Sequence, residues 1–581
     1  MKNIKSLLLV TLLGASFTSC NDFLNLEPLN DIVLENFWTD KSDVESVLLG
    51  AYSALEQSDC LTRMCVWGEM RSDNVVEGNG TGEDIRQILR ENILITNSYC
   101  KYTAFYDVIN RANTVLYYAP QVADKDPNFL IDELLAQEAE AVALRCLCYW
   151  YLIRSFHDVP YVTEPSIDDE GGRSKFYVPQ SSFEAVLDSI IKDLESVKKY
   201  AVNKYASEDA NTGRITKSAI CAMLADMYLW RGNDGDWDKC IAVCEEVNTL
   251  KMQDYEKIKS KEGRLCTLSL FNGYPLISDA ESDEYFGHSY DEIFGTGNSF
   301  ESLFELPYSF DVQNPFVGTY YQSYQSEQNR SVGQIKAYQK IGDGFSSSAG
   351  NEVFESPFDS RYFQNLLTRG TSYAITKYAY SDIDLRVSSG TLLRDYYNIR
   401  GQYAAQPNWI VYRYSEVLLF EAEAYIMKAK AAGDGSAEAT TCKEKAYNLI
   451  DAVNKRAIIY DVDKVRKANP KTLADLNYTS NLSVAGMEDL LFKERRRELM
   501  YEGKRWYDLV RMARRDGNQT RLLGFVEKKH DSSTLSAVKI KLKNPYAMYF
   551  PLAKDEIRNS YGCLKQNPAY KDDEEVQQAS H

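Results

Sequence analysis

Residues 67–75 bring together side chains that could bind a polar ligand. Arg71, Asp73 and Asn74 place a guanidinium, a carboxylate and an amide close together in the chain, and these groups bind sugar hydroxyls through paired hydrogen bonds. Trp67, just ahead of them, offers a flat ring on which a ligand could stack. The alternative is that the polar groups close the loop itself, since Asp and Asn side chains commonly bond nearby backbone. The sequence leaves both interpretations open.

Two tyrosine-rich stretches form a second set of candidates. Tyr320, Tyr321 and Tyr324 lie within residues 319–324, and Tyr396 is followed by another tyrosine. Tyrosine faces and hydroxyls suit stacking on pyranose rings, and they also suit holding a peptide backbone. Each ring could equally be buried in the core or exposed without a role. We treat all four as candidate ligand-binding residues.

The sequence carries no recognisable catalytic signature. Acid–base chemistry through imidazole is limited to four histidines, which are His157, His288, His530 and His581. The Gly-x-Ser-x-Gly, His-Glu-x-x-His and phosphate-binding loop patterns do not occur. The 84 Asp and Glu residues supply many carboxylate pairs, but nothing marks a glycosidase pair among them. We therefore expect no enzyme activity.

The twelve cysteines do not suggest a metal site. No neighbouring His completes a zinc set beside the three close pairs, which are Cys60 with Cys65, Cys146 with Cys148, and Cys240 with Cys244. Apart from Cys20, we expect most cysteines to be buried free thiols that behave as small hydrophobic residues, with one disulfide at most. The sequence therefore predicts no metal site and no cofactor, and it leaves open whether a calcium ion assists binding.

The charge balance excludes one large class of function. The 581 residues include 66 Lys and Arg against 84 Asp and Glu, which gives a formal net charge of -18 and a pI near 5.0. Proteins that bind nucleic acid need a basic surface that displaces counterions, and this chain is acidic. Hydrophobic residues make up 44% and charged residues 26%, as in an ordinary folded globular protein.

The first twenty residues have the pattern of an export signal. Lys2 and Lys5 precede an apolar run over residues 7–17, which is too short to cross a bilayer about 30 Å thick as a helix. A small residue before Cys20 then resembles a bacterial lipobox, in which the cysteine is lipidated and becomes the first residue of the mature protein. We expect residues 1–19 to be a lipoprotein signal peptide, with a plain signal peptide as the alternative. No later apolar stretch is long enough to span a membrane.

Helical periodicity dominates the rest of the chain. Apolar residues recur at helical spacing over residues 43–55, 133–156, 218–229, 237–247, 415–430 and 442–456. The last four of these form two pairs whose spacing resembles degenerate tetratricopeptide units. Residues 261–405 differ, because they are rich in Gly, Ser, Asn, Tyr and Phe with weak periodicity. Since long loops inside folded chains are usually functional, we expect this insertion to carry surface loops, short strands and the ligand face.

Residues 488–515 carry many arginines and could be mistaken for a nucleic-acid-binding arm. Acidic residues lie among the arginines at spacings of three and four, where side chains pair on a helix, and an apolar stripe runs beside them. We predict a packed helix with intrahelical and partly buried ion pairs.

Several ordered motifs resemble the SusD/RagB family of Bacteroidetes outer-membrane lipoproteins. The most specific are YRYSEVLL at 412–419 and ERRRELMYEGKRWYDLVR at 494–511, and further matches are ENFWTDKSDV at 35–44, EMRSDNV at 69–75 and YFPLAKDEI at 549–557. Residues 139–160 resemble the family helix that ends in Gly-Asp-Val-Pro, except that His157 stands where Gly is usual. The resemblance covers almost the whole chain after the signal.

The resemblance implies a mainly α-helical SusD-like fold with four tetratricopeptide-like helix pairs and long irregular loops that carry short strands. It implies one domain over residues 20–581, with an N-terminal helical part at 20–260, the insertion at 261–405 and a C-terminal helical part at 406–581. It also implies anchoring to outer-membrane lipid through acylated Cys20, exposure on the cell surface and a SusC-like TonB-dependent transporter as partner. Ligand residues are not carried over from the family, so the candidates above rest on composition and placement alone.

The expected function is non-catalytic binding of an oligosaccharide or polysaccharide and its delivery to the transporter. Two alternatives stay open. A RagB-like lipoprotein would bind peptide, since loops rich in Tyr, Asn and Asp suit either ligand. A scaffold of stacked helix pairs could instead bind only its partner protein.

Overall fold

The computed structural model describes residues 37–166, 177–258, 266–279, 285–295, 297–309, 312, 314–321, 333–342, 351–369, 372–388, 391–399, 407–459 and 482–571. Helices predominate among them, and the strands are short and paired two by two, which confirms the predicted fold class. No helix in these ranges is long and apolar enough to cross a membrane. The predicted signal peptide, Cys20 and Tyr324 lie outside the described residues.

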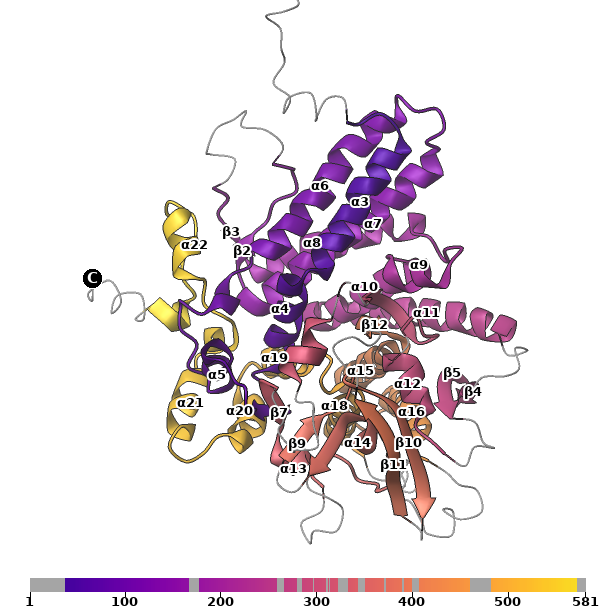
Figure 1. Ribbon diagram of the computed structural model, residues 1–581, viewed down its shortest axis with the longest axis vertical. Helices are drawn as coiled ribbons and strands as arrows, with labels where there is room; N and C mark the ends of the chain where they lie inside the picture. The colour runs from indigo at the N-terminus through magenta and orange to yellow at the C-terminus, as the bar shows by residue number, and fades with distance from the viewer. Residues whose placement is uncertain are drawn as a thin grey trace, which may run out of the picture.

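Four helices of the N-terminal part pack side by side and form the upper arm of the molecule in Figure 1. They are α3 (Lys41–Glu56), α6 (Thr103–Ala123), α7 (Ile131–Phe156) and α8 (Phe183–Val197). The Asp40 side chain caps α3 by accepting a hydrogen bond from the Ser42 backbone. Every residue of α7 from Ala139 onward is buried, as expected for a helix in the middle of a fold.

A second group of helices joins the middle of the chain to its C-terminal part. These are α10 (Lys217–Arg231), α11 (Asp236–Ile258), α15 (Tyr414–Ala432), α16 (Ala437–Ala457) and α18 (Val484–Leu499). Helix α11 packs against α15, so the chain leaves this group for the insertion and returns to it. The helices predicted from periodicity are all confirmed. Their assignment as tetratricopeptide-like units stays a prediction.

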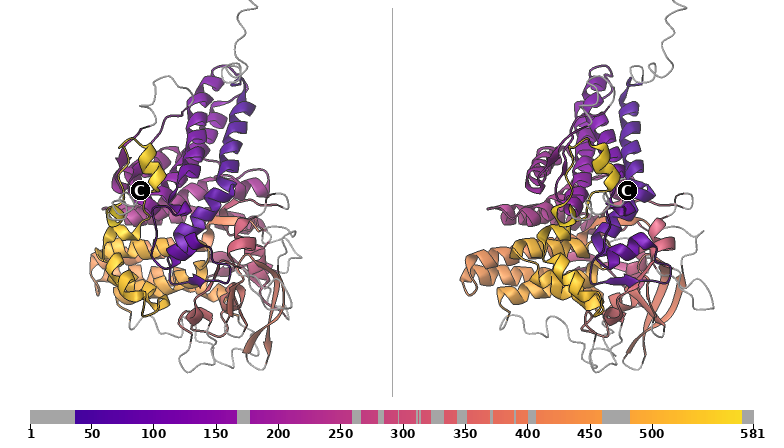
Figure 2. Two further views of the ribbon diagram at one scale, coloured as in Figure 1. Left: turned by 60° about the vertical axis from the view of Figure 1, so that its left-hand side comes forward. Right: turned by 90° about the vertical axis from the view of Figure 1, so that its left-hand side faces the viewer.

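The insertion contains more regular structure than its composition suggests. The described part of the insertion forms the hairpins β4 (Cys266–Phe271) with β5 (Tyr274–Asp279), β8 (Leu366–Arg369) with β9 (Ser372–Ile375), and β10 (Tyr380–Ser388) with β11 (Thr391–Ile399). Its short helices are α12 (His288–Phe294), α13 (Gln339–Gly342) and α14 (Ser360–Asn365). Figure 2 shows these strands on one side of the molecule, with α15 and α16 on the other.

Two strand pairs fasten the insertion to the rest of the chain. Strand β6 (Ser302–Leu306) pairs with β12 (Trp409–Arg413), which leads directly into α15. Strand β1 (Val75–Glu77), just after the predicted ligand loop, pairs antiparallel with β7 (Ile335–Ala337). The second pair matters for function, because it brings the N-terminal loop and the insertion together.

The Arg/Glu-rich segment is two helices, not one. Helix α18 ends at Leu499, and α19 (Arg505–Asp516) follows after a turn in which Tyr501 and Gly503 have positive φ. Arg495 and Arg497 are almost fully buried, which exceeds the partial burial that we predicted. Many of the ion pairs also run to other elements, because the turn inserts its acidic residue, Glu502, beside Arg413 of β12.

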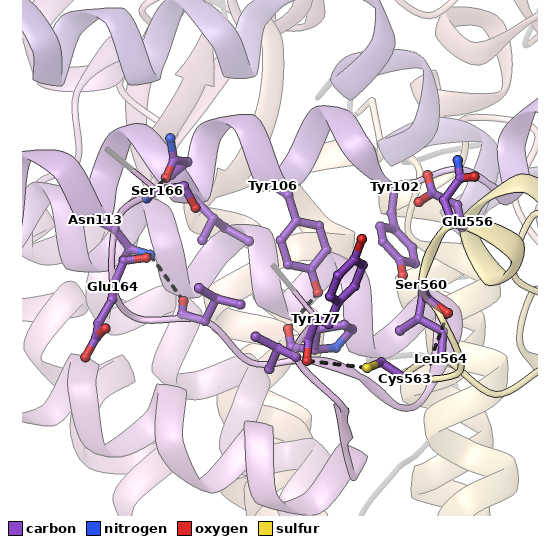
Figure 3. Close-up of a pocket in the computed structure, with 16 residues that line it drawn as sticks. Tyr102, Tyr106, Asn113, Glu164, Ser166, Tyr177, Glu556, Ser560, Cys563 and Leu564 are labelled. Carbon is purple, nitrogen blue, oxygen red and sulfur yellow. Dashed lines mark hydrogen bonds between the residues drawn. The ribbon is translucent and has the colours of Figure 1, made fainter. Parts of the chain in front are cut away.

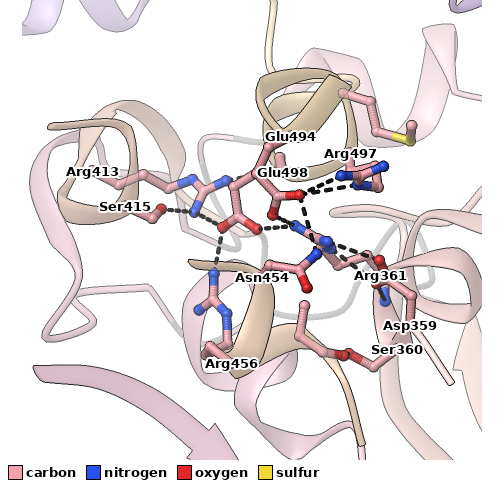
Figure 4. A network of polar contacts seen from close by, with 12 residues as sticks. Asp359, Ser360, Arg361, Arg413, Ser415, Asn454, Arg456, Glu494, Arg497 and Glu498 are labelled. Carbon is pink, nitrogen blue, oxygen red and sulfur yellow. Dashed lines mark hydrogen bonds and ion pairs between the residues drawn. The ribbon is translucent and has the colours of Figure 1, made fainter. Parts of the chain in front are cut away.

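A buried ionic network holds the insertion against these helices (Figure 4). Arg361 of α14 contacts Glu494 at 2.6 Å and Glu498 at 3.0 Å, and Arg413 contacts Glu498 at 2.6 Å. Arg456 of α16 contacts Glu301, ahead of β6, at 2.7 Å. Because buried charges are tolerated only when they are paired, the network fixes how the insertion sits on the helical body.

The remaining elements connect these parts. Short strands β2 (Val159–Pro160) and β3 (Gln180–Ser181) pair between α7 and α8. The other helices are α4 (Ser58–Glu69), α5 (Glu83–Leu89), α9 (Glu208–Gly213), α20 (Thr520–Val526), α21 (Leu535–Leu542) and α22 (Lys554–Asn559). Nine of the ten cysteines described as free are buried, with Cys563 half-buried, which confirms the expectation of buried thiols.

Candidate functional site

Arg71, predicted as a ligand-binding residue, lies in the core. Its side chain is fully buried, its Nη2 lies 2.5 Å from Oε2 of Glu91, and its Nη1 donates to the Met548 carbonyl at 2.8 Å. The guanidinium also stacks over the Trp506 ring at 4.2 Å. All faces of the group are therefore occupied, and the residue ties the loop to the C-terminal part of the chain.

Asp73 and Asn74 are buried in the same way. Asp73 Oδ1 accepts from Arg505 Nε at 2.9 Å, and Arg496 donates to Asn74 Oδ1 at 2.9 Å. Asn74 in turn donates to Glu69 Oε1 at 2.9 Å. Burial favours the protonated form of Asp73, but the two arginines outweigh it and hold its pKa well below the usual range. These polar groups hold the loop in place by bonding to the rest of the protein. This is the structural role that the sequence left open as the alternative to ligand binding.

Trp67 and Tyr321 are core aromatics. Trp67 is fully buried, its ring centroid lies 5.1 Å from that of Phe105, and its Nε1 donates to the Tyr99 carbonyl at 2.9 Å. Tyr321 is 1% exposed, and its hydroxyl donates to the Tyr501 carbonyl. Neither ring has a face open to a ligand, so the structure places both outside any surface site.

The other tyrosine candidates differ from one another in position. Tyr320 is 7% exposed, stacks on Phe316 with centroids 4.4 Å apart, and pairs its hydroxyl with that of Tyr99. Tyr396, on β11, is 50% exposed and donates to Asn398 Oδ1 at 2.8 Å. Tyr324 lies outside the described residues. Of the described candidates, Tyr396 alone presents a large open face.

The pairing of β1 with β7 builds a platform just beyond the buried loop. The Gly78 backbone donates to the Gln334 carbonyl at 2.9 Å, and the Gly80 backbone donates to the Gly333 carbonyl at 3.1 Å. A Cβ on Gly78 would lie 2.3 Å from the Gly333 carbonyl oxygen, so the close approach requires glycine there. Main-chain bonds therefore lock the N-terminal segment to the insertion.

Polar side chains cover this platform, and we call them the junction face. They are Glu77, Asn79, Glu83, Arg86, Arg90 and Gln334, all exposed or half-buried. Arg90 Nε lies 2.5 Å from Glu77 Oε1, and Arg86 Nη1 lies 2.7 Å from Glu83 Oε2. Gln334 Oε1 accepts from the Gly82 backbone at 3.3 Å. These contacts order the side chains while leaving hydrogen-bonding groups open to solvent.

The junction face carries groups suited to binding a ligand through hydrogen bonds. Guanidinium, carboxylate and amide groups in fixed positions can bond a ligand with many hydroxyls. The hydrogen bond from Arg86 lowers the pKa of Glu83, so this carboxylate stays ionised and acts as an acceptor. Nowhere in the described ranges do three or more His, Cys, Asp or Glu side chains gather in a way that could hold a metal ion.

Comparison with known families places the chain. A model described as the SusD family matches residues 301–570, and a model described as starch-binding and associating with the outer membrane matches residues 22–229. Together they cover most of the chain. The chain belongs to the SusD family. The resemblance expected from the sequence motifs is confirmed.

Relatives of this SusD-family chain match it along nearly its whole length. SusD-like protein P38 of Formosa agariphila is 24% identical over 530 residues, covering 88% of this chain and 91% of that protein. Surface glycan-binding protein A of Bacteroides thetaiotaomicron, solved with laminarihexaose, superposes with a TM-score of 0.59 at 18% identity, covering 91% of this chain and all of the other. A laminarin-binding SusD-like protein gives a TM-score of 0.59 at 22% identity, covering 92% of this chain and all of the other.

In this SusD-family chain, most of the described residues predicted from the sequence lie beside the junction face and not on it. The candidate loop at 69–75 is buried ahead of β1, and Tyr320 and Tyr321 of the second stretch are buried beside β7. One signal could have pointed to the junction face, since the Gly-Asn-Gly at 78–80 marks a turn directly after a short apolar strand. The charged residues of α5 that complete the face have no distinguishing pattern.

Proposed function

We propose that this protein binds an oligosaccharide or polysaccharide on the junction face and performs no catalysis. The observation that carries the proposal is the match over nearly the whole chain to surface glycan-binding protein A solved with laminarihexaose. The junction face supports it chemically, because it presents ordered donors and acceptors where the insertion meets the N-terminal part. Tyr396, with its open face, and Tyr324 are proposed as further stacking contacts.

The second part of the proposal concerns location and delivery. Cys20 carries the lipid that holds the protein at the outer membrane, exposed on the cell surface, and a SusC-like TonB-dependent transporter receives the glycan. The lipobox-like sequence ahead of Cys20 and the family model described as associating with the outer membrane support this placement. Co-purification of the transporter with the full-length chain, and its loss when Cys20 is replaced by Ala, test the anchoring step.

Gel retardation and calorimetry against a panel of plant, host and microbial polysaccharides test glycan binding. The chain without its first 20 residues serves for both, because it retains every described residue. Saturable binding of one polysaccharide that weakens in Arg90→Ala supports both the function and the site. Binding of mixed oligopeptides alone would instead identify a peptide-binding lipoprotein. Silence toward both, with an intact transporter complex, would favour the partner-binding scaffold.

A further inference from the structure

A cleft of about 290 Å³ opens on the N-terminal arm, away from the junction face (Figure 3). One wall is α6, the second is formed by residues 160–166 and 177–178, and the third is α22 with the residues that follow it. Its volume lies at the small end of the range of about 300–1,000 Å³ for ligand pockets. A ligand that fills it is therefore small.

Three tyrosines converge in the cleft. Tyr102 and Tyr106 project from the α6 side, and Tyr177 reaches toward them from the opposite wall (Figure 3). Tyr106 donates to the Pro160 carbonyl at 2.6 Å, which fixes its ring. The Tyr102 hydroxyl is buried and has no hydrogen-bond partner among the described residues. A buried hydroxyl without a partner is costly, so a ligand that bonds to it recovers free energy.

An exposed aromatic contacts one of the residues that line the cleft. Tyr561 is 71% exposed, and its ring meets that of Tyr177 edge-on with centroids 4.9 Å apart. Its backbone has a φ of +51°, in the left-handed region that non-glycine residues rarely adopt. Such strain is found preferentially at binding sites. An exposed ring held in a strained turn beside the half-buried Tyr177 is an arrangement that packing alone does not require.

The polar groups of the cleft select for charge. Its lining includes Asn110, Glu164, Ser166, Glu556 and Asn559, and no Lys or Arg lines it among the described residues. The two carboxylates repel phosphate, sulfate and uronate groups. Amides, hydroxyls and carboxylates beside aromatic faces suit neutral rings with many hydroxyls. Burial raises the pKa of Tyr102 far above its usual value, so this group keeps its proton and stays a donor.

We infer that this cleft is a second saccharide site, which takes one or two uncharged pyranose rings. The ring faces lie against Tyr177 and Tyr561, and one sugar hydroxyl bonds to the Tyr102 hydroxyl. The choice of a saccharide as ligand rests on the proposed function. The position of the site does not, because the cleft shares no residue with the junction face. A small cleft of this kind would hold the end of a chain or a short oligosaccharide, while the junction face holds its middle.

Saturation-transfer NMR with neutral monosaccharides and disaccharides tests the site. The probes are glucose, galactose, mannose, xylose, N-acetylglucosamine, maltose, cellobiose and laminaribiose, added at millimolar concentration to the chain without its first 20 residues. A lysine-containing tripeptide serves as the cationic probe. We expect at least one sugar to bind, and we expect its affinity to fall roughly three- to tenfold in Tyr561→Ala, where an aromatic contact is lost. Tyr117→Ala, another exposed tyrosine near the far end of α6, is the matched control and leaves the affinity unchanged.

Tyr102→Phe separates a ligand contact from a structural role. Removing a hydroxyl that has no partner leaves the melting temperature unchanged or higher, whereas it weakens sugar binding roughly three- to tenfold if the ligand supplies the partner. Equal affinities of wild type, Tyr561→Ala and Tyr102→Phe would overturn the inference, and so would binding of the tripeptide alone.

The same variants distinguish the two proposals. If polysaccharide binding responds to Arg90→Ala while no small sugar binds, the proposed function stands and the second site does not. If neither polysaccharide nor small sugar binds, both are refuted.

Discussion

Arg505 donates from Nε to Oδ1 of Asp73 at 2.9 Å, although the two residues are 432 positions apart in the chain. Arg505 Nη2 lies 3.2 Å from Asp73 Oδ2, and Arg496 Nη1 lies 3.1 Å from the same oxygen. All three side chains are buried. The loop that follows α4 is therefore clamped to α18 and α19, and this clamp supports the strand that carries the junction face.

Replacing Asp73 by Asn should destabilise the fold strongly. The amide cannot balance Arg496 and Arg505, and leaving one side of a buried ion pair unpaired costs about 3–5 kcal/mol. Urea unfolding measures the loss. Asp107→Asn is the control, because Asp107 is exposed and pairs with Arg111 at 3.2 Å on the surface, where such pairs contribute about 0–1 kcal/mol. Similar losses in the two variants would contradict the clamp.

The clamp also predicts how stability depends on acid. The pKa of Asp73 is lowered in the folded state, so its contribution is complete above the unfolded pKa of about 3.9 and disappears as the pH falls toward the folded value. The pKa of Glu423, buried against Arg511 and Arg515, is lowered in the same sense. The urea midpoint should therefore fall steeply below about pH 4. The urea midpoint of each variant is compared with the midpoint of the same variant at neutral pH. The fall in acid should be smaller in Asp73→Asn than in Asp107→Asn.

The sequence predicts the helices well, because the buried face of a helix produces a regular spacing of apolar residues that are close in the chain. The apolar spacing at 133–156 corresponds to α7, and the residues flanking α10 show its caps, Thr216 and Gly232. The family motifs extend this to the fold as a whole, because they occur in order along the chain.

The roles of residues 67–75 could not be predicted in the same way. Arg71 becomes a core residue only because Glu91 and the Met548 carbonyl surround it, and the second of these partners is 477 positions away. A polar loop that binds ligand and one that binds the rest of the protein have the same composition. Contacts with residues far away in the chain decide between the two roles, and the spacing of residues within the loop does not predict those contacts.

The junction face should lose affinity when its most exposed arginine is removed. Arg90→Ala deletes a charged donor whose side chain is 53% exposed, so polysaccharide affinity should fall roughly three- to tenfold, while stability changes by no more than about 0.5 kcal/mol. Arg111→Ala removes an arginine of similar exposure, also paired with one carboxylate, and should bind like wild type. Calorimetry with the polysaccharide found in the panel gives both affinities. Unchanged binding in Arg90→Ala would move the site away from the junction face.

Buried thiols should make the protein sensitive to alkali. Burial raises the pKa of eight cysteines, with Cys60 and Cys221 at about 12. The unfolded chain releases these protons above about pH 8.5 while the folded chain retains them, so stability falls as the pH rises. Three buried lysines with pKa lowered to about 8, Lys251, Lys377 and Lys529, act in the opposite sense. Because the thiols outnumber them, the urea midpoint under reducing conditions should decline between about pH 8 and about pH 9.5. A constant or rising midpoint would show that the thiols are more accessible than the structure indicates.

His157 holds a backbone conformation that favours glycine. Its φ is 71° and its ψ is -82°, and the Asp158 backbone donates to the Phe156 carbonyl at 3.1 Å across it, which makes the tight three-residue turn that ends α7. Its ring lies 4.8 Å from that of Tyr549, and its Nδ1 lies 2.7 Å from Asp158 Oδ1. These contacts offset the strain of a side chain in this position.

Two substitutions at this position should therefore rank in an unusual order. Both substitutions remove the ring contacts. His157→Ala keeps a Cβ at positive φ, which costs about 1–2 kcal/mol. His157→Gly removes this strain, but the greater entropy of its unfolded chain lowers the stability by about 0.4–1 kcal/mol. His157→Gly should be the more stable of the two by about 0.5–1 kcal/mol in urea unfolding. At Arg111, exposed within α6, the order should reverse, with Ala more stable than Gly by about 1 kcal/mol. The same order at both positions would mean that the turn after α7 relaxes when the histidine ring is removed.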